Sequence, residues 1–171
     1  MKHKLLLLYA WLVRILLIWC PDMPIIMRFR GRLYSLGTPK AGSNFQVSAN
    51  VIIKNLENCY FGRDVYLAPN VVINAIDDIK LESEVMIGFN SVLVSGNHSN
   101  INGSFRFGKS IKAPILIEKG AWVSANCTLT AGAKLPESSL LAANSVLTKS
   151  ISEKFIILGG VPAKKIGTVQ N

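Results

Sequence analysis

The sequence predicts an all-β fold, a parallel β-helix of hexapeptide repeats, from two observations. Large apolar residues recur with a period of six, and a small or β-branched residue follows most of them four positions later. Three short strands per turn would form a triangular coil with both positions inside, and stacked coils supply parallel hydrogen-bond ladders. We expect four to five coils. The large positions are Val47, Ile53, Phe61, Leu67, Ile73, Leu81, Ile87, Leu93, Ile117, Val123, Leu129, Leu135, Leu141 and Leu147, and the second positions are Val65, Val71, Val85, Ser91, Ala121, Cys127, Ala133, Ser139 and Ser145.

Composition agrees with one folded domain. The 171 residues are 50% hydrophobic and 17% charged, which excludes an intrinsically disordered chain. Three cysteines, an odd number without short spacings, argue against a disulfide framework or a zinc knuckle and favour a reducing compartment. We therefore expect a cytoplasmic protein.

Residues 1–40 form an apolar and basic segment ahead of the repeats. Every residue from Leu5 to Cys20 is apolar except Arg14, and Pro21 follows. This pattern predicts a helix that is apolar all round but too short to span a bilayer, which needs roughly 20 apolar residues. A small-residue cleavage site is missing after Cys20, so we do not expect a signal peptide.

The charge of this segment indicates its surroundings. Its seven basic residues and one acid give +6 of the chain's net +9; they are Lys2, Lys4, Arg14, Arg28, Arg30, Arg32, Lys40 and the acid Asp22. Two interpretations stay open: the helix caps the following domain, or it lies in a membrane interface with Arg28, Arg30 and Arg32 facing an anionic leaflet. Nucleic acid is not an expected partner, because no aromatic-interleaved basic stripe accompanies the charge.

The repeats occupy residues 41–150 and are interrupted by a loop, residues 97–114. Long loops on rigid scaffolds usually carry function, and this one opens with His98, the only histidine outside the N-terminal tail. An imidazole can take a proton from an attacking hydroxyl or amine. The final segment, 151–171, departs from the hexads and is expected to form a short helix or an extended arm over the last coil.

At these motifs the sequence resembles the hexapeptide-repeat acyltransferases, whose parallel β-helix is left-handed. The resemblance covers about Val47 to Gly167. Its most specific motifs are Gly96-Asn97-His98, Ala121-Trp122-Val123-Ser124-Ala125, Ala142-Ala143-Asn144-Ser145-Val146-Leu147-Thr148-Lys149 and Gly160-Val161-Pro162-Ala163-Lys164. The run from Pro21 to Arg32 is similar to the subset that O-acetylates bacterial surface polysaccharides, including lipopolysaccharide.

The resemblance implies a homotrimer with active sites between neighbouring coils, and acetyl-CoA as the donor substrate in a groove between subunits. It implies that His98 is the general base, that Asn97 contacts the acceptor, and that Trp122 walls either the acceptor or the thioester end of the donor. The backbone of Ala125 and Ala143 would bind the pantetheine arm of CoA. Thr148 and Lys149, with Lys164 or Lys165, would meet its phosphates. Thr148 and Lys149 also fit a solvated corner, and the two later lysines an ordinary basic tail. No metal is implied.

The expected function is an acetyl-CoA-dependent O-acetyltransferase acting on a sugar hydroxyl of a bacterial surface polysaccharide or its precursor, at the cytoplasmic face of the inner membrane. N-acetylation of a nucleotide-linked amino sugar uses the same fold and base, and a noncatalytic β-helix scaffold is the third interpretation. The zinc carbonic anhydrase built on this coil is excluded, because it needs three histidine ligands.

Overall fold

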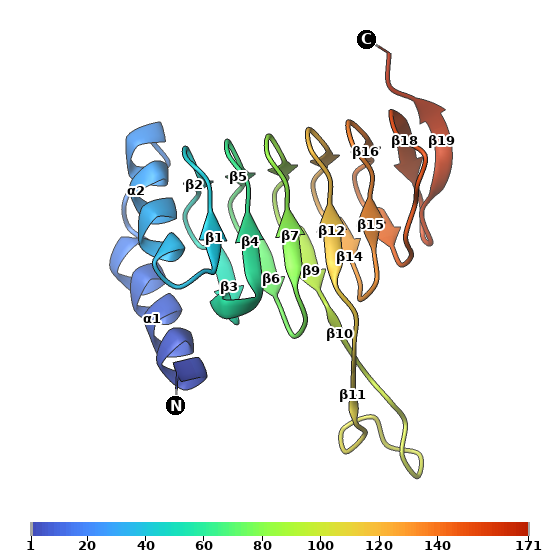
Figure 1. Cartoon of the computed structure of the whole chain (residues 1–171), viewed down its shortest axis with the longest axis horizontal. Coiled ribbons are helices and arrows are strands. Elements are labelled where there is room, and N and C mark those ends of the chain that lie inside the picture. Colours follow the sequence, from blue (N-terminus) through green and yellow to red (C-terminus); the bar gives the residue numbers. More distant parts are fainter. Residues whose placement is uncertain (1, 171) are drawn as a thin grey trace.

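Two helices close the N-terminal end of a triangular solenoid (Figure 1). This computed structural model describes residues 2–170, and the side chain of Lys2, counted above among the basic residues, lies outside that description. The apolar run forms α1 (Lys2–Leu17), as predicted. A second helix, α2 (Pro24–Ser35), was not predicted; Pro24 suits a first helical turn, and buried Met27 and Tyr34 lie seven residues apart on one face.

The strands form three faces, named here sheets A, B and C. Sheet A contains β1 (Lys40–Ala41), β4 (Cys59–Phe61), β7 (Ile79–Leu81), β12 (Ile115–Ile117) and β15 (Lys134–Leu135). Sheet B contains β2 (Gln46–Val47), β5 (Tyr66–Leu67), β8 (Met86–Ile87), β13 (Trp122–Val123), β16 (Leu140–Leu141), β18 (Ile156–Gly159) and β19 (Lys164–Thr168). Sheet C contains β3 (Ile52–Lys54), β6 (Val72–Asn74), β9 (Val92–Val94), β14 (Thr128–Leu129) and β17 (Val146–Leu147). A 3₁₀ turn, η1 (Leu56–Asn58), follows β3.

Within residues 2–170 these strands make five complete coils and a partial sixth, with parallel pairing throughout except between β18 and β19. The predicted inward positions are confirmed: none of the large hexad residues is more than 3% exposed, and the second positions are buried as well. The coil spacing is regular apart from one insertion. Ile73 pairs with Leu93, 20 residues on, and Leu129 with Leu147, 18 residues on, whereas Leu93 pairs with Leu129, 36 residues on.

Asparagines line the corner between sheets B and C. Asn50, Asn70, Asn90 and Asn126 all have φ near +60°, a left-handed conformation that asparagine tolerates better than most residues. Their side-chain amides form a ladder with N···O distances of 2.7, 3.0 and 3.1 Å. Arg14 of α1 completes it, donating from Nε and Nη2 to Asn50 Oδ1 at 3.0 and 2.7 Å. The arginine that interrupts the apolar run therefore joins helix to solenoid.

Arg30 corrects one part of the expected membrane contact. Its side chain is 3% exposed, donates to Asp22 Oδ1 at 2.6 Å and to the carbonyl of Leu17 at 3.1 Å, and also donates to the carbonyl of Cys20. It therefore ties the end of α1 to α2 and cannot face a lipid leaflet, whereas Arg28 and Arg32 are exposed. Over the described part of the chain, neither helix combines the length and the apolarity that crossing a membrane requires.

The C-terminal segment forms the extended arm and not the helix of the two predicted options. Residues 156 to 159 alternate between buried and half-buried, the period of two that suits a strand, and β18 adds to sheet B beside β16. The chain turns at Gly160 (φ +96°), and β19 returns antiparallel. The turn also covers β17, because Val146 N–H donates to the Gly160 carbonyl and its own carbonyl accepts from Ala163.

Candidate active site

The predicted loop forms a hairpin arm that projects from the solenoid between sheets C and A (Figure 1). Its stem pairs β10 (Gly96–His98) with β11 (Ser110–Lys112) in antiparallel register, which sets His98 opposite Ser110 and Asn97 opposite Ile111. The side chains of His98 and Asn97 are both exposed. The arm therefore presents the predicted general base outside the body of the protein.

Close backbone contacts hold the arm in shape. The N–H and hydroxyl of Ser99 both donate to the Lys109 carbonyl at 3.0 Å. A Cβ on Gly108 would lie 1.6 Å from the Ser99 carbonyl oxygen, so only glycine fits there. At the base, a Cβ on Gly96 would lie 2.8 Å from Ile76 Cγ1, which packs the stem onto the preceding coil.

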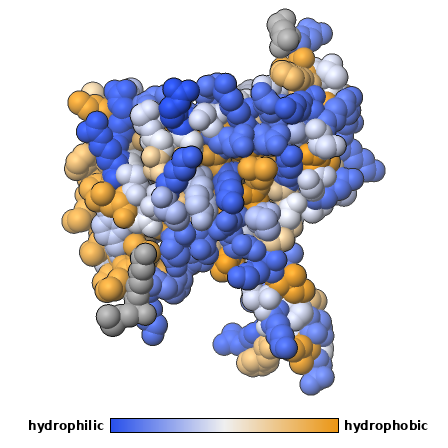
Figure 2. Space-filling view, in the orientation of Figure 1, coloured by the Kyte–Doolittle hydropathy of each residue, from blue (hydrophilic) through white to orange (hydrophobic). Residues whose placement is uncertain are grey.

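The arm also exposes apolar side chains. Ile101, Phe105, Phe107 and Ile111 are 41%, 62%, 77% and 53% exposed. The space-filling view shows this hydrophobic surface on the arm and a second one over the N-terminal helices (Figure 2). Clusters of this kind on a projecting element are typical of interaction surfaces.

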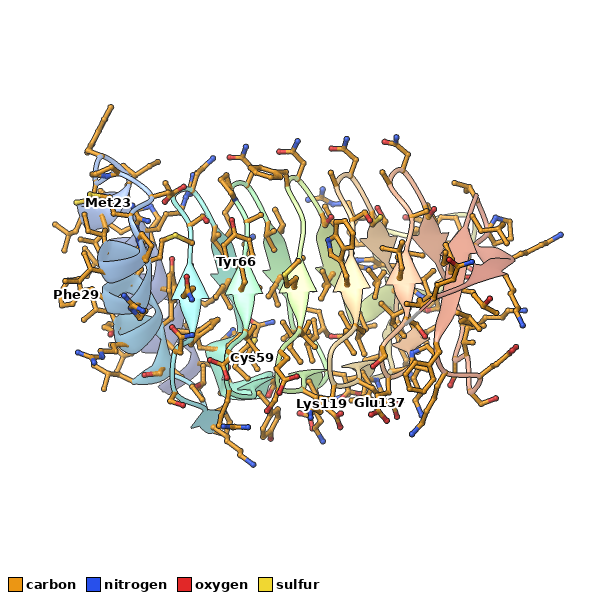
Figure 3. The ribbon with its side chains drawn as sticks, turned by 90° about the horizontal axis from the view of Figure 1, so that it is seen from above. Met23, Phe29, Cys59, Tyr66, Lys119 and Glu137 are labelled. Atoms are coloured by element: carbon orange, nitrogen blue, oxygen red, sulfur yellow. The ribbon has the colours of Figure 1, made fainter. Side chains whose placement is uncertain are left out.

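A groove of about 210 Å³ lies on the outer face of sheet B. It contains two predicted residues, Trp122 and Ala125, beside Tyr66, Met86 and Phe89, which the sequence analysis missed. Trp122, Met86 and Tyr66 stack in register on successive coils, and Figure 3 shows Tyr66 over this region of the solenoid. Each precedes a large core residue by one position, so apolar residues at this outward position are the signal that could have revealed the groove.

The two alanines predicted to bind pantetheine have free backbone groups. In the described part of the chain, no hydrogen bond uses the N–H of Ala125 or either backbone group of Ala143. The Ala125 carbonyl accepts from Asn144 N–H, which places these residues on adjacent coils of the corner between sheets B and C. This corner can offer amide donors and acceptors to an extended ligand with amides of its own.

The predicted phosphate-binding residues lie toward the C-terminal end and are exposed. Lys164 opens β19, the last strand of sheet B, while Thr148 and Lys149 follow β17 of sheet C. Among the described side chains, Lys149 and Lys164 form no ion pair, whereas Lys165 pairs with Glu153 at 2.5 Å. Lys149 and Lys164 therefore keep their charge available for an anion.

One chain does not bring these parts together. Trp122 and Ala125 line the groove of sheet B, but His98 and Asn97 leave from the corner between sheets C and A and line no part of it. A site that uses both the base and the groove needs the arm of one chain beside sheet B of another.

Two of the cysteines are buried. Burial raises the pKa of the Cys59 and Cys127 thiols, which disfavours the nucleophilic thiolate. Residues 2–170 contain no group of three His, Cys, Asp or Glu side chains placed to hold a metal ion.

No family model matches this chain. By sequence it is 25% identical to the galactoside O-acetyltransferase of Escherichia coli (strain K12) over 132 residues, which are 76% of this chain and 64% of that enzyme. A hexapeptide-repeat acetyltransferase from Vibrio cholerae O1 biovar eltor, solved with acetyl-CoA, superposes with a TM-score of 0.82 at 20% identity, covering 98% of this chain and 89% of its own. The chain has the hexapeptide-repeat β-helix fold. A galactoside acetyltransferase solved with coenzyme A agrees, with a TM-score of 0.85 at 20% identity over 99% of this chain and 83% of that chain.

These similarities confirm the predicted fold, and the sequence relatives are acetyltransferases. This hexapeptide-repeat β-helix spans less than two thirds of the length of the curated relatives that it matches. The left hand of the coil stays a prediction from the resemblance.

Proposed function

We propose that this protein is an acetyl-CoA-dependent O-acetyltransferase that acts on a sugar hydroxyl. The observation that carries the proposal is an exposed histidine on a shaped arm, within a fold and a sequence similar to sugar O-acetyltransferases. We propose further that the acceptor sugar belongs to a bacterial surface polysaccharide or its precursor. The basic, apolar N-terminal helices support this choice, because they suit a protein that works beside a membrane.

The chemistry is a direct transfer. The acceptor hydroxyl oxygen attacks the thioester carbon of acetyl-CoA while His98 takes the hydroxyl proton. The carbon–sulfur bond then breaks and the acetyl group stays on the sugar oxygen. The departing CoA sulfur takes the proton from His98 and leaves as the thiol. Trp122 and the groove around it would wall the thioester end, and Lys149 and Lys164 would meet the CoA phosphates.

We propose that the working unit is a homotrimer. Its support is the separation of His98 from the sheet B groove within one chain, together with the apolar residues on the arm, Phe105 and Phe107 among them. Packing the arm against a neighbouring chain would bury those side chains and complete the site. Sedimentation of the double variant Phe105→Ser, Phe107→Ser should show loss of the trimer. An unchanged trimer would contradict the role of the arm.

We propose peripheral contact with the cytoplasmic face of the inner membrane through the outer side of the two helices. Leu16, Trp19 and Phe29 are 72%, 91% and 52% exposed there, and Figure 3 shows Phe29 at the outer end of the molecule. Arg28 and Arg32 on α2 add exposed positive charge. Such a surface suits an anionic leaflet, where each basic side chain contributes about 1 kcal/mol. The double variant Leu16→Ser, Trp19→Ser should float less with anionic vesicles than the native chain. Equal flotation of the two proteins would argue against the contact.

The test of function is acetyl-CoA binding by calorimetry, followed by CoA release in the presence of bacterial glycan extracts. We expect His98→Ala to bind acetyl-CoA normally and to lose at least about a hundredfold in release rate. His3→Ala is the matched control, because His3 is the other histidine and pairs with Glu57 at the N-terminal end. It should keep the native rate.

Other outcomes redirect the assignment. Release that requires an amino sugar would indicate N-acetylation. Failure of the native chain to bind acetyl-CoA would overturn the groove assignment and favour the scaffold.

A further inference from the structure

A second groove, separate from that on sheet B, lies between α1 and sheet C at the N-terminal end. Its volume is about 570 Å³, within the range of pockets that hold small ligands. Its walls are mostly aliphatic and aromatic, and include Leu7, Ala10, Trp11, Val51, Ile52 and Ile76. Walls of this kind fit an apolar chain.

The groove also carries positive charge. Arg14 and Lys54 both line it, and neither forms an ion pair with any carboxylate of the described residues. Glu57, three residues beyond Lys54, pairs with His3 at 2.5 Å instead. Neither α1 nor α2 contains an acidic residue. An apolar groove with two uncompensated cations is complementary to an anionic amphiphile.

The groove leads to the arm. Ile76, which lines it, packs against Gly96 at the base of the arm, and His98 stands two residues farther along β10, about 7 Å at the rise of a strand. Lys54, Asn74 and Val94 are in register at the ends of the first three strands of sheet C. The path from the groove to His98, the predicted general base, therefore follows one corner of the solenoid across neighbouring coils.

We infer that this groove binds the aliphatic chain of the acceptor, and that the acceptor sugar is joined to that chain through a phosphate. The aliphatic chain of the acceptor contacts Trp11 and Ile52, its phosphate binds Arg14 and Lys54, and its sugar extends toward His98. This inference rests on the proposed function, since it names the class of acceptor for the same base.

The experiment measures binding of dodecyl phosphate to the full chain, with dodecanol and inorganic phosphate as separate probes. We expect dodecyl phosphate to bind at least tenfold more tightly than either. Ile52→Trp, which fills the groove, should weaken binding at least tenfold, while Ile52→Val leaves it within twofold. Lys54→Gln should weaken it several-fold.

A second readout does not depend on those variants folding well. A bromine-labelled dodecyl phosphate should quench tryptophan fluorescence in the native chain, and Trp11→Phe should remove most of that quenching. Equal quenching in Trp11→Phe would overturn the placement of the aliphatic chain beside Trp11. Equal binding of inorganic phosphate would reduce the site to an anion site, and equal binding of dodecanol would remove the role of the cations.

Acetyl-CoA binding and His98-dependent CoA release, measured on the same samples, separate the two proposals. If both are intact and dodecyl phosphate does not bind, the inference fails and the proposed function stands. If dodecyl phosphate binds but the chain does not use acetyl-CoA, the proposed function fails. Dodecyl phosphate should also compete with the glycan acceptor and not with acetyl-CoA; binding without that competition would indicate a membrane-lipid site and overturn the acceptor assignment.

Discussion

Replacing Arg14 by methionine should loosen the joint between α1 and the solenoid. The methionine keeps an apolar stem of similar length but removes the two hydrogen bonds to Asn50 Oδ1. A hydrogen bond to a charged group contributes about 1.5–3 kcal/mol. Both bonds share one acceptor and the guanidinium is half-buried, so we expect a loss of about 1–2 kcal/mol, or roughly 2–8 °C in Tm for a chain of this size.

A double-mutant cycle tests whether the bond itself is responsible. Asn50→Gly removes the acceptor and suits the local φ of +57°, so it adds no backbone strain. Urea unfolding at one fixed protein concentration should give a coupling energy of about 1 kcal/mol or more between the two changes. Arg28→Met, an exposed cation of α2, is the control and should change stability by less than about 0.5 kcal/mol. Additivity of Arg14→Met and Asn50→Gly would refute this explanation of Arg14.

Three further expectations concern the core, the arm and the thiols. Leu129→Ala, at a fully buried position in the fourth coil, should cost about 2–5 kcal/mol in urea unfolding, and a smaller loss would mean that neighbouring coils close the cavity. Gly108→Ala should speed tryptic cleavage of the arm with little change in Tm, because the added Cβ displaces only the hairpin. A thiol reagent at pH 8 should modify half-buried Cys20 well before Cys59 and Cys127; equal rates would contradict their raised pKa values.

The solenoid could be predicted because its information is local and repeated. Each hexad specifies the same two inward positions, so every coil tests the assignment again, and residues such as Phe61 and Leu141 are buried as expected. The C-terminal hairpin was harder to predict from the sequence. Its alternation of buried and half-buried residues spans only four positions, from Ile156 to Gly159, a length that a short helix also allows.

The second helix and the role of Arg30 depend on contacts that a linear pattern does not contain. Three arginines at alternate positions look like one basic cluster, but Arg30 alone is buried, against Asp22 and three backbone carbonyls. The sequence suggested which residues belong to the candidate site, but not how they are arranged in space. His98 and Trp122 are 24 residues apart in sequence, yet His98 lies on the arm between sheets C and A whereas Trp122 lies on the outer face of sheet B.

The 36-residue step from Leu93 to Leu129 shows that the solenoid accommodates the arm without a break in the parallel pairing on either side. Sheet pairing resumes in the same register, so the arm could be lengthened, shortened or exchanged while each strand of the solenoid kept its neighbours. The arm, which we propose meets the acceptor, can therefore change independently of the part that determines stability. New acceptor preferences could arise on this scaffold by substituting a single contiguous segment.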